Sequence, residues 1–208
     1  MRIAELSSRS GTSIPSIKFY LREGLLPAGE STGRNQADYG DTHLYRLRLI
    51  RALMDVGKLS VAAAREVLAA VDTPDLPGHS LLGAAAYSIQ KPANRNPDDP
   101  HWQAARREVL ERVRARGWEV DEGVPAVDLA ADAVAAYRQL GQEDLLACFD
   151  TYLEVCERIA AQEVGLVVAR QDPARMVEGV VTGTIIGEVL FNALRRLAQQ
   201  NASAKLLQ

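Results

Sequence analysis

Two cations lie four residues apart in a short stretch that is otherwise largely apolar and aromatic, "SIPSIKFYLREGLLP" at residues 13–27. In a helix, Lys18 and Arg22 would share one face, from which both could reach phosphates or base edges. Ile17 and Leu21 are also four apart, on a different face, where they would anchor the helix inward. These residue types and spacings indicate a helix built to meet a polyanion.

The start and the end of this helix are indicated by the residues that flank it. Ser13 is a good N-cap, because its hydroxyl can accept from a free backbone N–H of the next turn. Pro15 falls in the first turn, where a missing N–H costs little, and Gly24 ends the helix. We therefore expect a helix over 14–23, and the backbone N–H groups at its start, beside Ser13 and Ser16, suit a phosphate.

The neighbouring segments provide the elements that would position this helix. A short helix is predicted over 3–9, and the turn at 11–13 contains glycine, so the two helices form a helix-turn-helix. Residues 27–41 are rich in Gly, Pro, Ser, Asn and Asp and predict a loop or a short hairpin. Two further helices follow over about 44–57 and 60–71, the first with apolar residues every three or four positions.

These segments carry a family resemblance. The run "IAELSSRSG…SIPSIKFYLREGLL", followed by "LYRLRLIRALMDVGKLSVAAAREVL", resembles the DNA-binding head of bacterial MerR-type transcriptional regulators over about residues 1–72. The resemblance implies a winged helix-turn-helix. Its second helix enters the major groove of double-stranded DNA, while the wing and the third helix brace the backbone. It also implies a homodimer on a pseudo-palindromic promoter, where an effector-driven change in DNA shape lets RNA polymerase use that promoter.

The resemblance carries over residue by residue, with departures in the second helix and the wing. Phe19 stands where many members have a second tyrosine. Gln36 and Ala37 replace the usual Tyr-Arg of the wing, with Arg34 and Asn35 as the nearest substitutes. The residues predicted to meet DNA are Ser13, Pro15, Ser16, Lys18, Phe19, Tyr20, Arg22, Arg34, Asn35, Tyr39, Arg46, Arg48 and Arg51.

Composition and charge agree with a small basic head on an acidic body. The 208-residue chain is 47% hydrophobic and has a formal net charge of −3. Residues 1–72 hold ten Lys/Arg against eight Asp/Glu, a net of +2, and residues 73–208 hold fourteen against nineteen, a net of −5. This asymmetry fits a head that meets a polyanion. No apolar run approaches the roughly 20 residues that span a bilayer, and no secretory signal is visible, so we expect a cytoplasmic protein without a membrane partner.

The rest of the chain predicts a helical body. "TPDLPG" and "KPANRNPDDP" indicate a linker over 73–100 with one short helix at about 80–90. Helices are predicted over 101–117, 126–140, 143–164 and 173–200, the last buried and with Gly179, Gly183 and Gly187 on one face. The expected fold is therefore mainly α: a winged helix-turn-helix over 1–72 and an all-helical effector-binding and dimerisation domain over 101–208. The glycine-lined helix is the candidate dimer contact.

The body offers a candidate small-molecule site but no metal site. Aromatic residues with nearby carboxylates would suit a lipophilic cation, although the same aromatics could simply fill a core. Cys148 and Cys156 lack the further converging ligands that a metal needs, and we expect two buried thiols. The candidate effector residues are Tyr137, Phe149, Tyr152 and Phe191.

The sequence therefore predicts a homodimeric, sequence-specific DNA-binding transcriptional regulator controlled by a small-molecule effector. No phosphate loop, metal cluster or nucleophile with a base motif is present, so we expect no enzyme activity, cofactor or metal. The altered wing leaves one alternative open, a ligand-binding or sequestering protein whose DNA-binding head is weak or vestigial.

Overall fold

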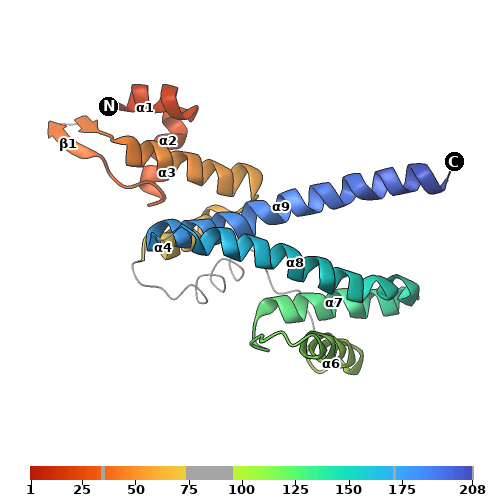
Figure 1. Cartoon of the computed structure of the whole chain (residues 1–208). Helices are drawn as coiled ribbons and strands as arrows, with labels where there is room; N and C mark the ends of the chain where they lie inside the picture. Colours follow the sequence, from red (N-terminus) through yellow and green to blue (C-terminus); the bar gives the residue numbers. More distant parts are fainter. Residues whose placement is uncertain (34–35, 74–95, 171, 208) are drawn as a thin grey trace. The chain divides into compact units, whose positions relative to one another are not determined.

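A computed structural model describes residues 1–33, 36–73, 96–170 and 172–207. Its fold is 74% helical with a small two-stranded sheet (Figure 1), which confirms the mainly α class. Two compact units divide the chain. The N-terminal unit comprises the described residues of 1–88 together with those of 177–208, and the middle unit comprises the described residues of 89–176.

The helix-turn-helix is formed by α1, Ile3–Ser10, and α2, Ile14–Arg22. The Ser13 hydroxyl caps α2 by accepting from the N–H of Ser16 at 3.2 Å, as the sequence predicts. Gly24 follows the end of α2 with φ +72°, a left-handed conformation that L side chains rarely adopt. The local signals thus set both ends of α2 to within one residue.

The wing is the antiparallel hairpin of β1, Glu30–Gly33, and β2, Gln36–Asp38. Its inner end is tied to the start of the chain, because the N–H of Tyr39 donates to the carbonyl of Met1 at 2.8 Å. The hairpin predicted within 27–41 is therefore present.

The head is completed by α3, Asp41–Arg51, a π-helical turn, Ala52–Val56, and α4, Val61–Val71. The apolar stripe predicted along the first of these helices is buried, so the period of three to four residues correctly identified the inward face. Its members are Leu44, Leu47, Ile50 and Leu53.

The middle unit is a small helical cluster of α6, Pro100–Ala115, α7, Pro125–Gln139, a 3-10 helix, Glu143–Cys148, and α8, Phe149–Val168. Valine, alanine and leucine side chains from α6, α7 and the start of α8 make its core. Partly buried aromatic residues pack against that core, namely Trp102, Trp118 and Phe149.

The last helix, α9, spans Pro173–Leu206, and from Val177 onward it belongs to the N-terminal unit. Ile185 is 2% exposed, and its Cγ2 lies only 2.3 Å from where a Cβ on Gly57 would be. The leucines after Ile185 are exposed, so the expectation that this helix is buried holds only for its first half.

One described segment, Arg175–Leu206, is long and apolar enough by composition to cross a membrane, with a mean hydropathy of 1.4 over its most apolar part. The expectation that no apolar run reaches this length is therefore wrong for α9. An interface helix of a soluble protein can have the same composition.

Candidate nucleic-acid interface

The exposed face of α2 is formed by residues three and four positions apart. Pro15, Lys18 and Arg22 are exposed and Phe19 is partly exposed, and this spacing places all four on one side of the helix. Ile17, on the opposite side, is fully buried. The helix therefore presents an ammonium group and a guanidinium fork together, which can bind phosphates as a point charge and as a paired donor.

Tyr20 lies in the core, away from these two cations. It is 9% exposed, and its ring centroid is 5.8 Å from that of Phe19. Burial raises the pKa of Tyr20, the Asp55 carboxylate raises it further, and Arg51 opposes them, so the phenol keeps its proton at neutral pH. Tyr20 is thus placed as a packing residue, and Phe19 lies with the cations instead.

Tyr39, the wing tyrosine predicted to meet DNA, is also buried. Its ring meets the ring of His43 edge-on, with centroids 5.3 Å apart. The remaining wing candidates, Arg34 and Asn35, lie outside the described residues.

The start of α2 is largely satisfied within the protein. The Ser16 N–H donates to the Ser13 hydroxyl, and the Ser13 and Ser16 hydroxyls are 2.7 Å apart. The Ile17 N–H donates to the Ser13 carbonyl, and Pro15 has no N–H to offer. The first-turn N–H of Ile14 has no hydrogen bond to a described residue and is available to a phosphate.

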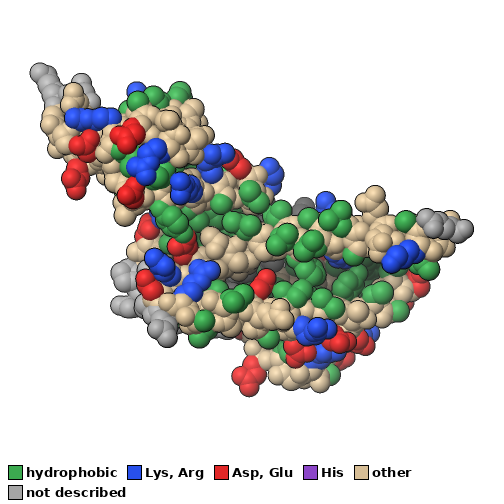
Figure 2. All heavy atoms as spheres, turned by 45° about the horizontal axis from the view of Figure 1, so that its top comes forward, with side chains coloured by type: hydrophobic (Ala, Val, Ile, Leu, Met, Phe, Trp, Pro, Cys, Tyr) green, Lys and Arg blue, Asp and Glu red, His purple; other side chains and the backbone are tan. Residues whose placement is uncertain are grey.

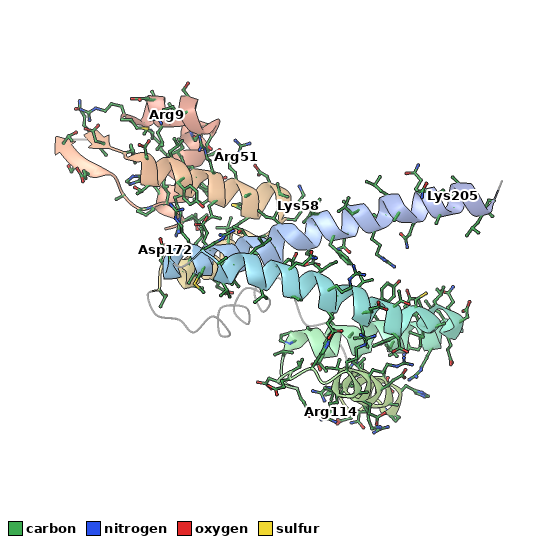
Figure 3. All side chains as sticks on the ribbon, viewed as in Figure 1. Arg9, Arg51, Lys58, Arg114, Asp172 and Lys205 are labelled. Atoms are coloured by element: carbon green, nitrogen blue, oxygen red, sulfur yellow. The ribbon has the colours of Figure 1, made fainter. Side chains whose placement is uncertain are left out.

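Two of the three arginines predicted on α3 stabilise the head. Arg46 forms a two-pronged ion pair with Asp72 at 2.8 and 2.6 Å, and its Nε donates to the Leu25 carbonyl at 3.0 Å. Arg51, labelled in Figure 3, pairs with Asp55 at 3.3 Å and also donates to the Ser10 carbonyl. Arg48 is exposed and has no such partner among the described residues.

Ion pairing therefore sorts the cations of the head, apart from Arg34, into two groups. The paired ones are Arg2, Arg9, Arg46, Arg51 and Arg65. Those with no hydrogen bond or ion pair to a described residue are Lys18, Arg22, Arg48 and Lys58.

Lys58, which has no hydrogen bond or ion pair among the described residues, was not among the residues predicted to meet DNA. It follows the π-helical turn and has φ +57°, and Figure 3 shows its side chain at the end of that helix. Its position directly after Gly57 was the available signal, since a residue that leaves a helix end is commonly exposed.

The predicted effector residues do not form one described cluster. Phe149 packs against the core of the middle unit, with the guanidinium of Arg112 4.8 Å above its ring. Tyr137 is partly exposed and Tyr152 is exposed, whereas Phe191 belongs to the N-terminal unit. These four assignments stay predictions.

Cys148 and Cys156 are both exposed, so the expectation of two buried thiols is wrong. Partial desolvation raises the pKa of the Cys156 thiol, which disfavours the reactive thiolate. Among the described residues, no group of three His, Cys, Asp or Glu side chains is placed to hold a metal.

Comparison with known proteins supports the assignment of the head. The family model described as MerR HTH family regulatory protein matches residues 1–71. The HTH-type transcriptional regulator HmrR of Sinorhizobium medicae is 38% identical over 69 residues, covering 33% of this chain and 46% of that protein. The heavy metal-dependent transcription regulator 2 of Rhizobium meliloti is 36% identical over 69 residues, with the same coverage. This chain therefore spans just under half the length of these two relatives.

A solved structure extends the likeness beyond the head. The candidate transcriptional regulator SCO5550 of Streptomyces coelicolor A3(2) is 39% identical, with a TM-score of 0.74 over 99% of this chain and 97% of that one. The helix-turn-helix of α1 and α2, its wing and the matches to these regulators lead to one conclusion: the chain belongs to the MerR family of transcriptional regulators, with the family's helix-turn-helix at its N-terminus.

Proposed function

We propose that this MerR-family chain binds double-stranded promoter DNA with α2 in the major groove. The observation that carries this proposal is the pair of exposed cations, Lys18 and Arg22, which lack partners among the described residues. A cation without an internal partner can neutralise a phosphate and release its counterion at no cost in broken ion pairs. Arg48 and the wing are the secondary contacts, and the bound chain acts on RNA polymerase in the cytoplasm.

The same proposal includes a homodimer formed through the exposed half of α9. Hydrophobic side chains gather along this helix toward the C-terminus (Figure 2). Leu190, Leu194 and Leu197 are 60%, 54% and 61% exposed. They continue the spacing of Gly183 and Gly187 in alternating steps of four and three, which is the spacing of a helix-helix seam. A Cβ on Gly183 would meet no atom within 4 Å, so space for a partner helix remains open.

The effector of this regulator is, in this proposal, a small organic molecule held by the middle unit. One relative is named for its dependence on heavy metals, but its match covers 69 residues, the length of the head alone. The feature that favours an organic effector is the set of partly buried aromatic side chains in the middle unit, Trp102, Trp118 and Phe149.

The DNA-binding proposal is tested by salt-dependent binding. The full chain would first select fragments from a genomic library. Binding to the strongest fragment would then be measured at several salt concentrations for the wild type and for Lys18→Ala combined with Arg22→Ala. Each phosphate contact contributes roughly 0.9 to the slope of log affinity against log salt. The double variant is expected to lose roughly two units of slope and at least about tenfold in affinity.

A matched control removes one arginine and one lysine outside the head, with Arg158→Ala combined with Lys205→Ala. Both side chains are exposed, and we expect the slope to stay within error of the wild type. A folded wild-type chain that binds no genomic fragment would contradict the proposal and favour the ligand-binding alternative. Equal slopes of log affinity against log salt for the two double variants would show that Lys18 and Arg22 do not contact DNA phosphates.

A further inference from the structure

A groove runs along the outer face of α6 in the middle unit. Its volume is about 490 Å³, within the range of small-molecule sites. Gln103, Arg107, Leu110 and Arg114 line it at steps of four, three and four residues, and Glu122 also lines it. None of the four aromatic residues predicted to bind an effector lines this groove.

The charges of the groove are unequally satisfied. Arg106 has partners within the unit, since its Nε donates to Asp128 at 2.9 Å and its Nη2 donates to the backbone carbonyl of Glu122 at 2.6 Å. Arg114, labelled in Figure 3, forms an ion pair with the Glu122 carboxylate. Arg107 also lines the groove, and among the described residues it has no hydrogen bond or ion pair. The carboxylates of Glu122 and Asp128 are thus paired with arginines. The guanidinium of Arg107 has no such partner among the described residues and is available to a ligand.

The groove also has an apolar wall. Trp102 contributes its indole, whose orientation is held by donation of the ring N–H to Asp132 at 2.8 Å. Leu110 also lines the groove and is almost fully buried. An indole is large and rigid, so Trp102 loses little side-chain entropy when a ligand ring stacks on it. A planar guanidinium beside such a wall suits a carboxylate or phosphate on an apolar body.

From this arrangement we propose that the α6 groove binds a small amphipathic organic anion, whose acidic group pairs with Arg107 and whose apolar part lies on Trp102 and Leu110. The claim that this anion is the effector of the regulator rests on the proposed function. The claim that the groove binds such an anion rests on the groove alone. The charge of this ligand is opposite to that of the lipophilic cation predicted from the aromatic residues of the body.

The test is calorimetric titration of the full chain with 1-naphthoate, 1-naphthyl phosphate and the cation 1-naphthylmethylammonium. The two anions compare carboxylate with phosphate, and the cation reverses the charge on the same ring. We expect at least one anion to bind, and to bind at least about tenfold more weakly to Arg107→Ala, because a charge-assisted hydrogen bond is lost. The control variant Arg158→Ala removes an exposed arginine of α8 and should bind like the wild type.

Three results would overturn the site. The first is no binding of either anion at millimolar concentration. The second is an unchanged affinity in Arg107→Ala. The third is a cation that binds as tightly as the anions. Circular dichroism of Arg107→Ala checks that the fold is kept, as expected for an exposed side chain without a partner among the described residues.

Retardation of the selected DNA fragment, in the same preparations, separates this inference from the proposed function. If the chain binds DNA but neither anion, the groove site is contradicted and the proposed regulator function stands. If the chain binds an anion through Arg107 but binds no DNA, the groove site stands and the proposed regulator function is contradicted. If both hold, the anion is expected to change DNA affinity in the wild type and not in Arg107→Ala.

Discussion

At the scale of single residues, what a cation does in this protein depends on whether it has a partner. Arg46 and Arg48 stand two positions apart on α3, yet Arg46 is held by Asp72 and the Leu25 carbonyl, whereas Arg48 is exposed. The side chain of Arg46 is only 12% exposed, although its partner Asp72 is 58% exposed, so the guanidinium itself is largely withdrawn from solvent. The same residue type therefore stabilises the fold at one position and is available to DNA at the other.

This contrast gives a paired prediction. Arg46→Ala leaves the Leu25 carbonyl and the Asp72 carboxylate without their donor, and should lower the free energy of unfolding by about 1–3 kcal/mol. Arg48→Ala should change it by less than about 0.5 kcal/mol and should weaken DNA binding several-fold instead. Urea unfolding and DNA retardation measure the two effects. Equal stability losses in both variants would show that pairing does not separate their roles.

At the scale of elements, one close contact within the N-terminal unit joins Gly57, which follows the π-helical turn, to Ile185 of α9. Gly57 has ordinary φ and ψ of −70° and −10°, so its conformation does not require glycine. Space does, because a Cβ there would lie 2.3 Å from the Ile185 Cγ2 and 2.7 Å from the Leu53 carbonyl oxygen. The first half of α9 is held against the head at this point.

Gly57→Ala should therefore lower the free energy of unfolding by about 1–3 kcal/mol, as overpacking does. In an Ile185→Ala background the same Gly57→Ala change should cost less stability, because the methyl group in contact is gone, although Ile185→Ala also lowers stability by itself, since Ile185 is buried. Urea unfolding of the two single variants and of the double variant measures this coupling. The control is Gly33→Ala in the wing, where a Cβ would meet nothing within 4 Å. An equal loss at both glycines would contradict the steric explanation.

At the scale of the whole molecule, the middle unit is inserted into the N-terminal unit. The chain leaves the N-terminal unit after the head, forms the middle unit, and returns as α9. A change in the middle unit therefore has a covalent route to the head through both of its ends. The exposed leucines of α9 follow directly on the segment held against the head, so a partner on that helix would also act close to the head.

The dimer proposed on α9 predicts a large effect of one charge. Leu194→Glu should weaken self-association by at least about 100-fold, because two buried leucines, each contributing about 1.5–3 kcal/mol, become two facing carboxylates. Sedimentation velocity over a concentration series measures it. Leu140→Glu, at a leucine that is 70% exposed in the middle unit, is the matched control. A wild-type chain that is monomeric at high micromolar concentration would contradict the dimer.

The sequence by itself determined the elements of the head. Ser13 and Gly24 predict the ends of α2, and the period of Leu44, Leu47 and Ile50 predicts the buried face of α3. These signals are readable because capping, left-handed glycine and helical periodicity are local effects. The spacing of Lys18 and Arg22 likewise predicted the exposed pair that became the candidate interface.

Only the tertiary structure decided which cations are free, which way Tyr20 lies, and that α9 returns to the head. Arg46 meets an acid 26 residues away and Arg65 one 42 residues away, and no local pattern encodes such pairs. Tyr20 is apolar on its ring and polar at its tip, so helical spacing alone does not assign it to core or surface. Gly57 and Ile185 are also distant in sequence, and their contact depends on how whole elements pack.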